Sequence, residues 1–409
     1  MIKIGYPHVD RRDGRARLGA DIIIDGKEYN LWYEVSDEYA DGLCADRGDA
    51  FVLALLYYAM VKKHDIVSEA PLTWELKEGI ERDFLDVVCE ALPGRKPYHV
   101  ALTCACCNPI QKERQVSATG ISCGVDSLYS VKRRLVDGVA KNVGDRYLVL
   151  NDVHGAVAND SESKHAARWE RLLNQAKRFS VESNIPLIVG TTNFNADAIP
   201  GLSFEFSTTS GNLFCAFAMQ NLFTDYYLAS GGPLENLRDC IEGGVFSVQL
   251  DDYELLYCSA VSTRSLKVVS DGLAFRVEKV RALSAWPLAQ KFLDVCHVHA
   301  EGRAKNGTND CPKCMHTVVE LLAQGPGVLE RFSNVFDVDY VLSHKDEYLA
   351  ELMRRRFIGV QSAKESWAYR SVMGFSFADY VSAIIIFMRK AVKKVLRHGS
   401  VSKTFSPRG

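Results

Sequence analysis

Residues 117–135 read S-A-T-G-I-S-C-G-V-D-S-L-Y-S-V-K-R-R-L, and the rest of the chain is organised around them. The lead-in, residues 114–120, is compact and partly β-branched, which predicts a short buried strand. Beyond a polar turn, apolar residues at 128, 131 and 135 recur at helical spacing. A strand, a glycine-containing turn and a helix start direct backbone N–H groups at an anion. The stretch therefore predicts an anion site, with Asp126 or Ser127 as helix N-cap.

Composition bounds the remaining possibilities. With 409 residues, the chain is long enough for two or three domains. A net charge of −2 argues against a broad positive surface that would attract nucleic acids. No secretory signal opens the chain and no apolar run reaches membrane-spanning length, so we expect a cytoplasmic protein without a membrane partner. Twelve cysteines spread along such a chain favour buried thiols and one metal site over disulfides.

Residues 1–110 are predicted to form a separate N-terminal α+β module. A strand turns at Asp25-Gly26 into a second strand, and Asp49 is expected to cap a helix that is apolar nearly all round. The cysteine-rich segment 104–107 lacks a second cluster at zinc spacing, so packed thiols are favoured over metal. Nothing in this module indicates chemistry.

Residues 111–328 alternate between strands and helices. Further strands are predicted at 146–150, 185–190 and 223–229, with helices between them. This alternation is typical of an α/β fold with a parallel sheet and right-handed crossovers. Ligands of such sheets bind beyond the carboxyl ends of the strands. We therefore expect four polar tips to converge on one pocket: residues 120–127, 151–155, 191–193 and 230–232.

Several of these polar positions allow two interpretations. Asp152 and His154 could coordinate Mg²⁺ or contact substrate, or could cap the next helix. Thr191 and its neighbours suit a base or a ribose but are also ordinary turn residues. Gly211, expected at a helix start, could permit close approach of a ligand.

A second candidate site lies late in the chain. Cys296 precedes the motif C-P-K-C, which contains Cys311 and Cys314, and this spacing has zinc-knuckle character. A tetrahedral site needs a fourth ligand, for which His297, His299, His316 and Cys240 are candidates. A metal-free thiol cluster is the alternative. Zinc this far from the loop would be structural.

Residues 329–409 are predicted to form a helical C-terminal extension. The segment A-I-I-I-F-M followed by R-K-A-V-K-K-V-L-R is basic and amphipathic. Such a helix can bind a membrane or an acidic partner, or can dock on its own domain.

Residues 122–127, S-C-G-V-D-S, resemble the S-G-G-x-D-S signature of the PP-loop ATP pyrophosphatases, with Cys123 where that family has glycine. Together with the helix after T-S-G-N and the late cysteines, residues 115–325 resemble 7-cyano-7-deazaguanine synthase and its relatives. That synthase holds zinc with four cysteines, and Thr317 stands where the last would fall. The added terminal segments are similar to extended relatives in anti-phage systems of the CBASS and Qat types.

The resemblance implies an adenine nucleotide alpha hydrolase-like fold and an ATP-dependent ligase. Such an enzyme adenylates a carboxylate like 7-carboxy-7-deazaguanine, releases pyrophosphate and passes the acyl group to ammonia or a protein amine. Its implied cofactors are ATP, Mg²⁺ and structural Zn²⁺, with Asp126 and Ser127 in catalysis. The ATP-binding residues would be Gly120, Ser122, Cys123, Gly124, Val125, Asp126, Ser127, Asp152, Thr191 and Gly211.

Two other functions stay open from the sequence. One is a thiolation or amidation enzyme acting on tRNA or a metabolite, for which Cys123 is the candidate sulfur carrier. The other is a non-catalytic nucleotide-sensing subunit.

Overall fold

The computed structural model describes residues 1–91, 97–138, 144–153, 162–195, 198–202, 204–243, 250–296, 306, 311–325, 327–357 and 375–399. Contacts divide the chain into two compact units. The first comprises residues 1–122 and 126–274, and the second comprises residues 123–125 and 275–409.

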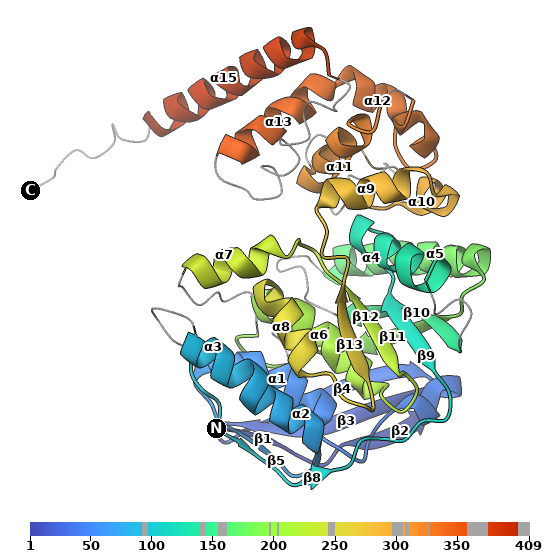
Figure 1. Cartoon of the computed structure of the whole chain (residues 1–409), viewed down its shortest axis with the longest axis vertical. Coiled ribbons are helices and arrows are strands. Elements are labelled where there is room, and N and C mark those ends of the chain that lie inside the picture. Colours follow the sequence, from blue (N-terminus) through green and yellow to red (C-terminus); the bar gives the residue numbers. More distant parts are fainter. Residues whose placement is uncertain are drawn as a thin grey trace, which may run out of the picture. The chain divides into compact units, whose positions relative to one another are not determined.

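Five parallel strands form one half of an 11-stranded sheet in the first unit (Figure 1). They are β9 (Val116–Gly120), β10 (Asp145–Val153), β11 (Leu187–Thr192), β12 (Asp225–Ala229) and β13 (Lys267–Asp271). Their spatial order is β13-β12-β9-β10-β11, and every neighbouring pair is parallel. This is the 3-2-1-4-5 order of doubly wound sheets, whose switch point lies between β9 and β12. The predicted α/β class with a parallel sheet is confirmed.

The N-terminal strands continue the same sheet. They are β1 (Ile2–Ile4), β2 (His8–Arg12), β3 (Arg15–Ile24), β4 (Lys27–Ser36), β5 (Ile66–Ser68) and β7 (Leu102–Thr103). β4 pairs antiparallel with β11, which joins the two halves. The β3–β4 hairpin turns at Asp25 and Gly26, both at positive φ, as predicted. A separate two-stranded sheet pairs β6 (Leu72–Thr73) with β8 (Cys106–Cys107).

The predicted boundary at residue 110 therefore does not coincide with a division between compact units. The residues expected as a separate module share a sheet and a hydrophobic core with the parallel strands. The sequence pattern predicted the hairpin but carried no signal that its outer strand pairs with β11.

Helices cover the sheet of the first unit (Figure 1). They are α1 (Asp49–Lys62), α2 (Trp74–Glu78), α3 (Asp86–Ala91), α4 (Val125–Ser130), α5 (Glu162–Ser183), α6 (Phe204–Ala218), α7 (Glu235–Gly243) and α8 (Glu254–Ala260). α1 packs against α6 and is buried nearly all round, as its composition predicted. Asp49 is the first residue of α1 and Gly48 is the N-cap, so the predicted cap is wrong by one residue. The buried Asp49 carboxylate accepts hydrogen bonds from the backbone N–H and the hydroxyl of Thr73.

The second unit is helical. It contains α9 (Arg276–Ser284), α10 (Pro287–Phe292), α11 (Pro312–Leu322), α12 (Val338–Ser343), α13 (Lys345–Phe357) and α15 (Phe377–Gly399). α15 packs along α13. The unit resumes at Phe275, so the predicted boundary at residue 328 also differs from the observed division. Among the described residues, no helix combines the length and the apolar character needed to cross a membrane.

Candidate functional site

The loop between β9 and α4 is closed by two serines. The Ser122 backbone N–H donates to the Ser127 hydroxyl oxygen at 3.2 Å, and the two hydroxyl oxygens lie 3.1 Å apart. α4 begins at Val125, so Asp126 and Ser127 lie in its first turn and not at the predicted N-cap.

Cys123 has a left-handed backbone conformation, with a φ of 58°. A β-carbon makes this conformation costly, which explains why glycine is the usual residue at such a turn. The Cys123 carbonyl accepts a hydrogen bond from the Asp294 N–H at 2.8 Å. Its side chain is buried, and burial raises the pKa of the Cys123 thiol well above its ordinary value. Because nucleophilic sulfur is thiolate, both the burial and the raised pKa disfavour a reactive role for this thiol.

A pocket of about 290 Å³ opens at the carboxyl ends of β9, β10 and β12. Four of the predicted ligand-binding residues line it: Gly120, Ser122, Asp126 and Ser127. Much of the remaining wall is apolar and consists of Ile121, Val149, Leu150, Leu228 and Ala229. The pocket spans the switch point between β9 and β12, where doubly wound sheets bind ligands.

Three polar residues of this pocket are not among the predicted ATP-binding residues: Asn151, Asn212 and Tyr226. Asn151 lies in the expected polar tip at residues 151–155, and Asn212 lies in the T-S-G-N segment. Their positions therefore carried a signal, but nothing distinguished them from the neighbouring polar residues.

Other predicted residues do not line the pocket. Asp152 lies 3.1 Å from His165 Nε2 of α5. Thr191 accepts a hydrogen bond from Arg15 at 3.3 Å. Gly211 lies inside α6, not at its start, and a β-carbon there would lie 3.0 Å from the Phe194 ring. Gly211 therefore serves helix packing. Val125 is buried at the start of α4, directly after Gly124, and His154 lies outside the described residues.

The polar side chains of residues 192 and 193 form hydrogen bonds within the sheet and do not line the pocket. The Thr192 hydroxyl donates to the Trp32 carbonyl at 2.5 Å, and the Asn193 side chain bonds the backbone of β4. The expected convergence of four polar tips is therefore wrong for the tip at residues 191–193. β4, an antiparallel neighbour of β11 that was not predicted, provides the hydrogen-bond partners of these side chains.

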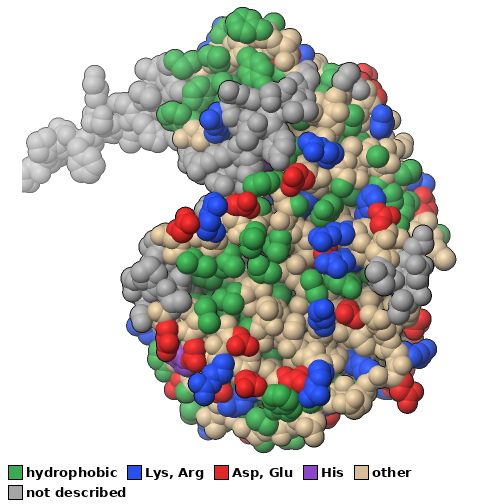
Figure 2. All heavy atoms as spheres, in the orientation of Figure 1, with side chains coloured by type: hydrophobic (Ala, Val, Ile, Leu, Met, Phe, Trp, Pro, Cys, Tyr) green, Lys and Arg blue, Asp and Glu red, His purple; other side chains and the backbone are tan. Residues whose placement is uncertain are grey.

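Asp126 is the only charged side chain that lines the pocket within the described residues. A polyphosphate there would depend on backbone N–H groups and a divalent cation for charge balance. Figure 2 shows acidic and basic side chains intermixed on one face, which agrees with the net charge of −2. No field of one sign would steer a nucleic acid to that face.

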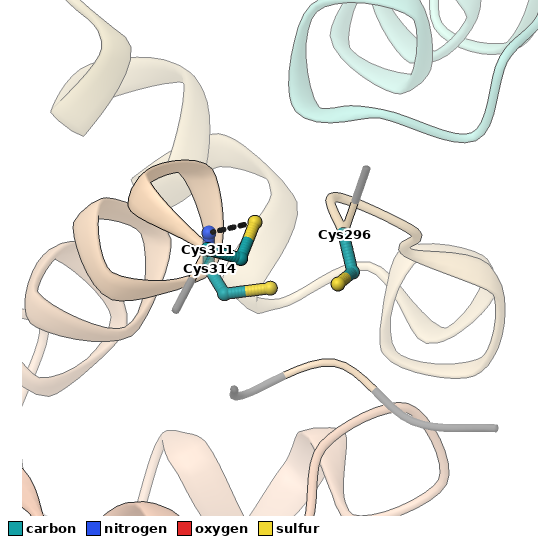
Figure 3. A group of neighbouring side chains, drawn as sticks. All are labelled: Cys296, Cys311 and Cys314. Atoms are coloured by element: carbon teal, nitrogen blue, oxygen red, sulfur yellow. Dashed lines mark hydrogen bonds between the residues drawn. The ribbon is translucent and has the colours of Figure 1, made fainter. Parts of the chain in front are cut away.

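The late cysteines gather in the second unit. The sulfur atoms of Cys296, Cys311 and Cys314 all lie within 4.8 Å of one another, and the three side chains are buried (Figure 3). The Cys314 N–H donates to the Cys311 sulfur at 3.4 Å (Figure 3). Such a bond favours a thiolate at Cys311, and three soft sulfur donors suit Zn²⁺.

Two residues of α11 at positions considered for a fourth ligand have other partners. Thr317 accepts from Arg276 at 2.9 Å and donates to the Lys313 carbonyl. His316 faces Glu320, with 3.5 Å between Nε2 and a carboxylate oxygen. Within the described residues, His316 is not part of the group of potential metal ligands that the three cysteines form. His297, His299 and the side chain of Cys240 lie outside the described residues.

Comparisons with family models, with curated proteins and with solved structures found no match to this chain.

Proposed function

We propose that this chain is an ATP-dependent, AMP-forming ligase of the PP-loop ATP pyrophosphatase type. One observation carries the proposal: the S-C-G-V-D-S loop joins β9 to α4 and lines a pocket beside the sheet's switch point. A strand–loop–helix element at this position is suited to bind phosphates. The resemblance of the loop sequence suggests which phosphates, namely those of ATP cleaved between the α and β positions.

The reaction follows from the poor leaving group of a carboxylate. A carboxylate oxygen attacks the α-phosphorus of ATP, the bond to the β-phosphate oxygen breaks, and pyrophosphate leaves. A neutral amine then attacks the acyl carbon and displaces AMP, losing one proton to solvent. The protein contributes alignment and charge stabilisation, and no base is required of it.

In this proposal the loop residues have separate roles. Ser122, Gly124, Ser127 and the adjacent N–H groups hold the pyrophosphate portion. Asp126, the charged group of the pocket wall, binds Mg²⁺, which offsets phosphate charge. Cys123 has a left-handed conformation, which glycine, the residue at this position of the signature, adopts without strain.

The resemblance suggests a deazapurine such as 7-carboxy-7-deazaguanine as the carboxylate. Ammonia or an amine of a partner protein would be the acceptor, and anti-phage defence is the setting suggested by the extended relatives. The cysteine group would hold Zn²⁺ as a structural ion, with Cys296, Cys311 and Cys314 as three of its ligands.

Of the two alternatives, thiolation is disfavoured. Sulfur transfer needs an accessible thiolate, and the Cys123 thiol is buried with a raised pKa. A nucleotide-sensing subunit would bind ATP in the same pocket without turning it over.

Product analysis tests the proposal. The full chain is incubated with ATP, Mg²⁺ and 7-carboxy-7-deazaguanine or other carboxylates, and pyrophosphate and AMP are quantified. We expect carboxylate-dependent release that Asp126→Ala abolishes and that Asp137→Ala, an exposed carboxylate paired with Lys132, leaves intact. ATP binding without pyrophosphate from any carboxylate would favour the sensor.

A further inference from the structure

A tyrosine from the N-terminal half of the chain reaches the pocket wall. Tyr33 lies on β4, and its hydroxyl donates to Asn151 Oδ1 at 2.9 Å. Asn151 lines the pocket from β10, whereas β4 lies two strands away. The tyrosine ring must therefore cross β11 to make this contact.

Gly190 of β11 permits the crossing. In the sheet register Gly190 is paired with Asn151, and Tyr33 is paired with Thr192 two residues further on. A β-carbon at Gly190 would lie 2.2 Å from the Tyr33 hydroxyl oxygen. Only glycine leaves room for the ring at this point.

The tyrosine ring is fixed in place. It is fully buried and packs edge-on against Phe214 of α6, with ring centroids 6.4 Å apart. A buried hydroxyl has to donate its proton to an acceptor, and Asn151 Oδ1 is that acceptor. The amide of Asn151 is thereby oriented with Oδ1 toward Tyr33, which leaves Nδ2 as its donor.

A second amide of the same pocket is oriented the other way, with its nitrogen bonded to the protein and its oxygen left to accept. Asn212 Nδ2 donates to the Thr208 carbonyl at 2.8 Å. A carbonyl oxygen can only accept, so this contact fixes the orientation of the Asn212 amide. Asn212 Oδ1 then remains as an acceptor in the pocket wall.

We propose that Asn151, held by Tyr33, and Asn212 form a hydrogen-bonding edge that reads a purine-type base, with Asn151 Nδ2 as donor and Asn212 Oδ1 as acceptor. The amidine edge of adenine and the lactam edge of a guanine-type base both present one acceptor beside one donor. The apolar wall of Ile121, Val149 and Leu228 suits a flat ring. Tyr33 is a positioning residue, since it acts through Asn151. The inference rests on the proposed function and names the base chemistry of the same pocket.

Binding of matched ligands to the full chain with Mg²⁺, measured by titration calorimetry, tests the inference. The probes are ATP, purine riboside triphosphate, which lacks the exocyclic donor, and inorganic tripolyphosphate, which lacks a base. 7-Deazaguanine and unsubstituted 7-deazapurine form a second pair. Tyr33→Phe removes the hydroxyl and keeps the ring, and Tyr98→Phe removes a hydroxyl that donates to Asp65 instead.

We expect Tyr33→Phe to lower the affinity for one base-containing ligand about tenfold and to leave the affinity for tripolyphosphate unchanged. Tyr98→Phe should leave all affinities unchanged. Loss of ATP affinity assigns the edge to adenine, and loss of 7-deazaguanine affinity assigns it to the acyl substrate. The wild-type chain should prefer ATP over purine riboside triphosphate, or 7-deazaguanine over 7-deazapurine, by about tenfold.

The inference would be overturned if Tyr33→Phe lowered the affinities for ATP and tripolyphosphate equally, or if it lowered the affinity for none of the ligands. If Tyr33→Phe does not fold, the wild-type preferences decide, and ratios near one in both pairs would overturn it. A chain that releases pyrophosphate yet shows no base preference leaves the proposed function standing and removes only this inference. A chain that binds none of the probes removes both.

Discussion

The backbone N–H of Trp32 donates a hydrogen bond to Asn193 Oδ1 at 2.9 Å, although 161 residues separate the two. The same amide donates through Nδ2 to the Asn30 carbonyl at 2.8 Å. One side chain just beyond β11 thus satisfies both a donor and an acceptor of β4. These hydrogen bonds help hold β4 against β11, where the N-terminal strands join the parallel half of the sheet.

Asn193→Ala should lower the free energy of unfolding by about 1–3 kcal/mol, because it removes the partners of two backbone groups. Urea unfolding followed by circular dichroism measures this change. Asn174→Ala, on the exposed side of α5, is the control and should stay within about 0.5 kcal/mol of wild type. An Asn193 variant as stable as this control would contradict the role given to the amide.

Cys123→Gly should leave pyrophosphate release within about threefold of wild type. Glycine adopts the φ of 58° without strain, and the buried thiol takes no part in the proposed reaction. The measurement is carboxylate-dependent pyrophosphate release by both proteins at equal concentration. A loss of activity by more than about a hundredfold in a folded variant would revive the sulfur-carrier alternative.

Purified protein should contain about one zinc ion per chain, as measured by mass spectrometry of the metal. Cys311→Ser should lose this zinc, because the serine hydroxyl is a poor zinc ligand. Cys258→Ser, at a buried cysteine of the other compact unit, should retain it. Equal zinc content in the two variants, or none in wild type, would mean that the three thiols pack without metal.

Lys112 should make stability depend on pH in a defined window. Its ammonium donates to the carbonyls of Phe223 and Ser265, and burial lowers its pKa from 10.5 to about 8. Between these values the unfolded chain binds more protons at this site, so the contribution of Lys112 to stability rises with pH.

The difference in unfolding free energy between wild type and Lys112→Met isolates this effect, because the other titrating groups cancel. We expect the difference to shift in favour of wild type by up to about 3 kcal/mol from pH 8 to pH 10.5. A difference that stays constant over this range would contradict the lowered pKa.

Local patterns predicted much of the fold. The alternation of apolar strands and amphipathic helices after residue 115 was sufficient for the parallel sheet, because strand and helix periodicities are read within one segment. The pairing of β4 with β11 was not predictable in this way. It depends on contacts between residues such as Trp32 and Asn193, which no local pattern records.

The same distinction applies to the site. Ser122, Asp126 and Ser127 were predicted because a contiguous motif contains them, and they do line the pocket. Asp152 and Thr191 were chosen for their polarity at strand ends, but they bond to His165 and Arg15. Asn151 belongs to the predicted polar tip at residues 151–155 but was not singled out within it. Its hydrogen bond with Tyr33 joins two residues that no local pattern relates.

Isotope exchange between ATP and labelled pyrophosphate tests the central claim most directly, because adenylate formation is reversible and exchange needs no acceptor amine. The full chain should exchange label into ATP only when Mg²⁺ and a carboxylate such as 7-carboxy-7-deazaguanine are present. Asp126→Ala should abolish the exchange, and Asp137→Ala should preserve it. Absence of exchange with every carboxylate, in a protein that binds ATP and Mg²⁺, would contradict the assignment as an adenylating ligase.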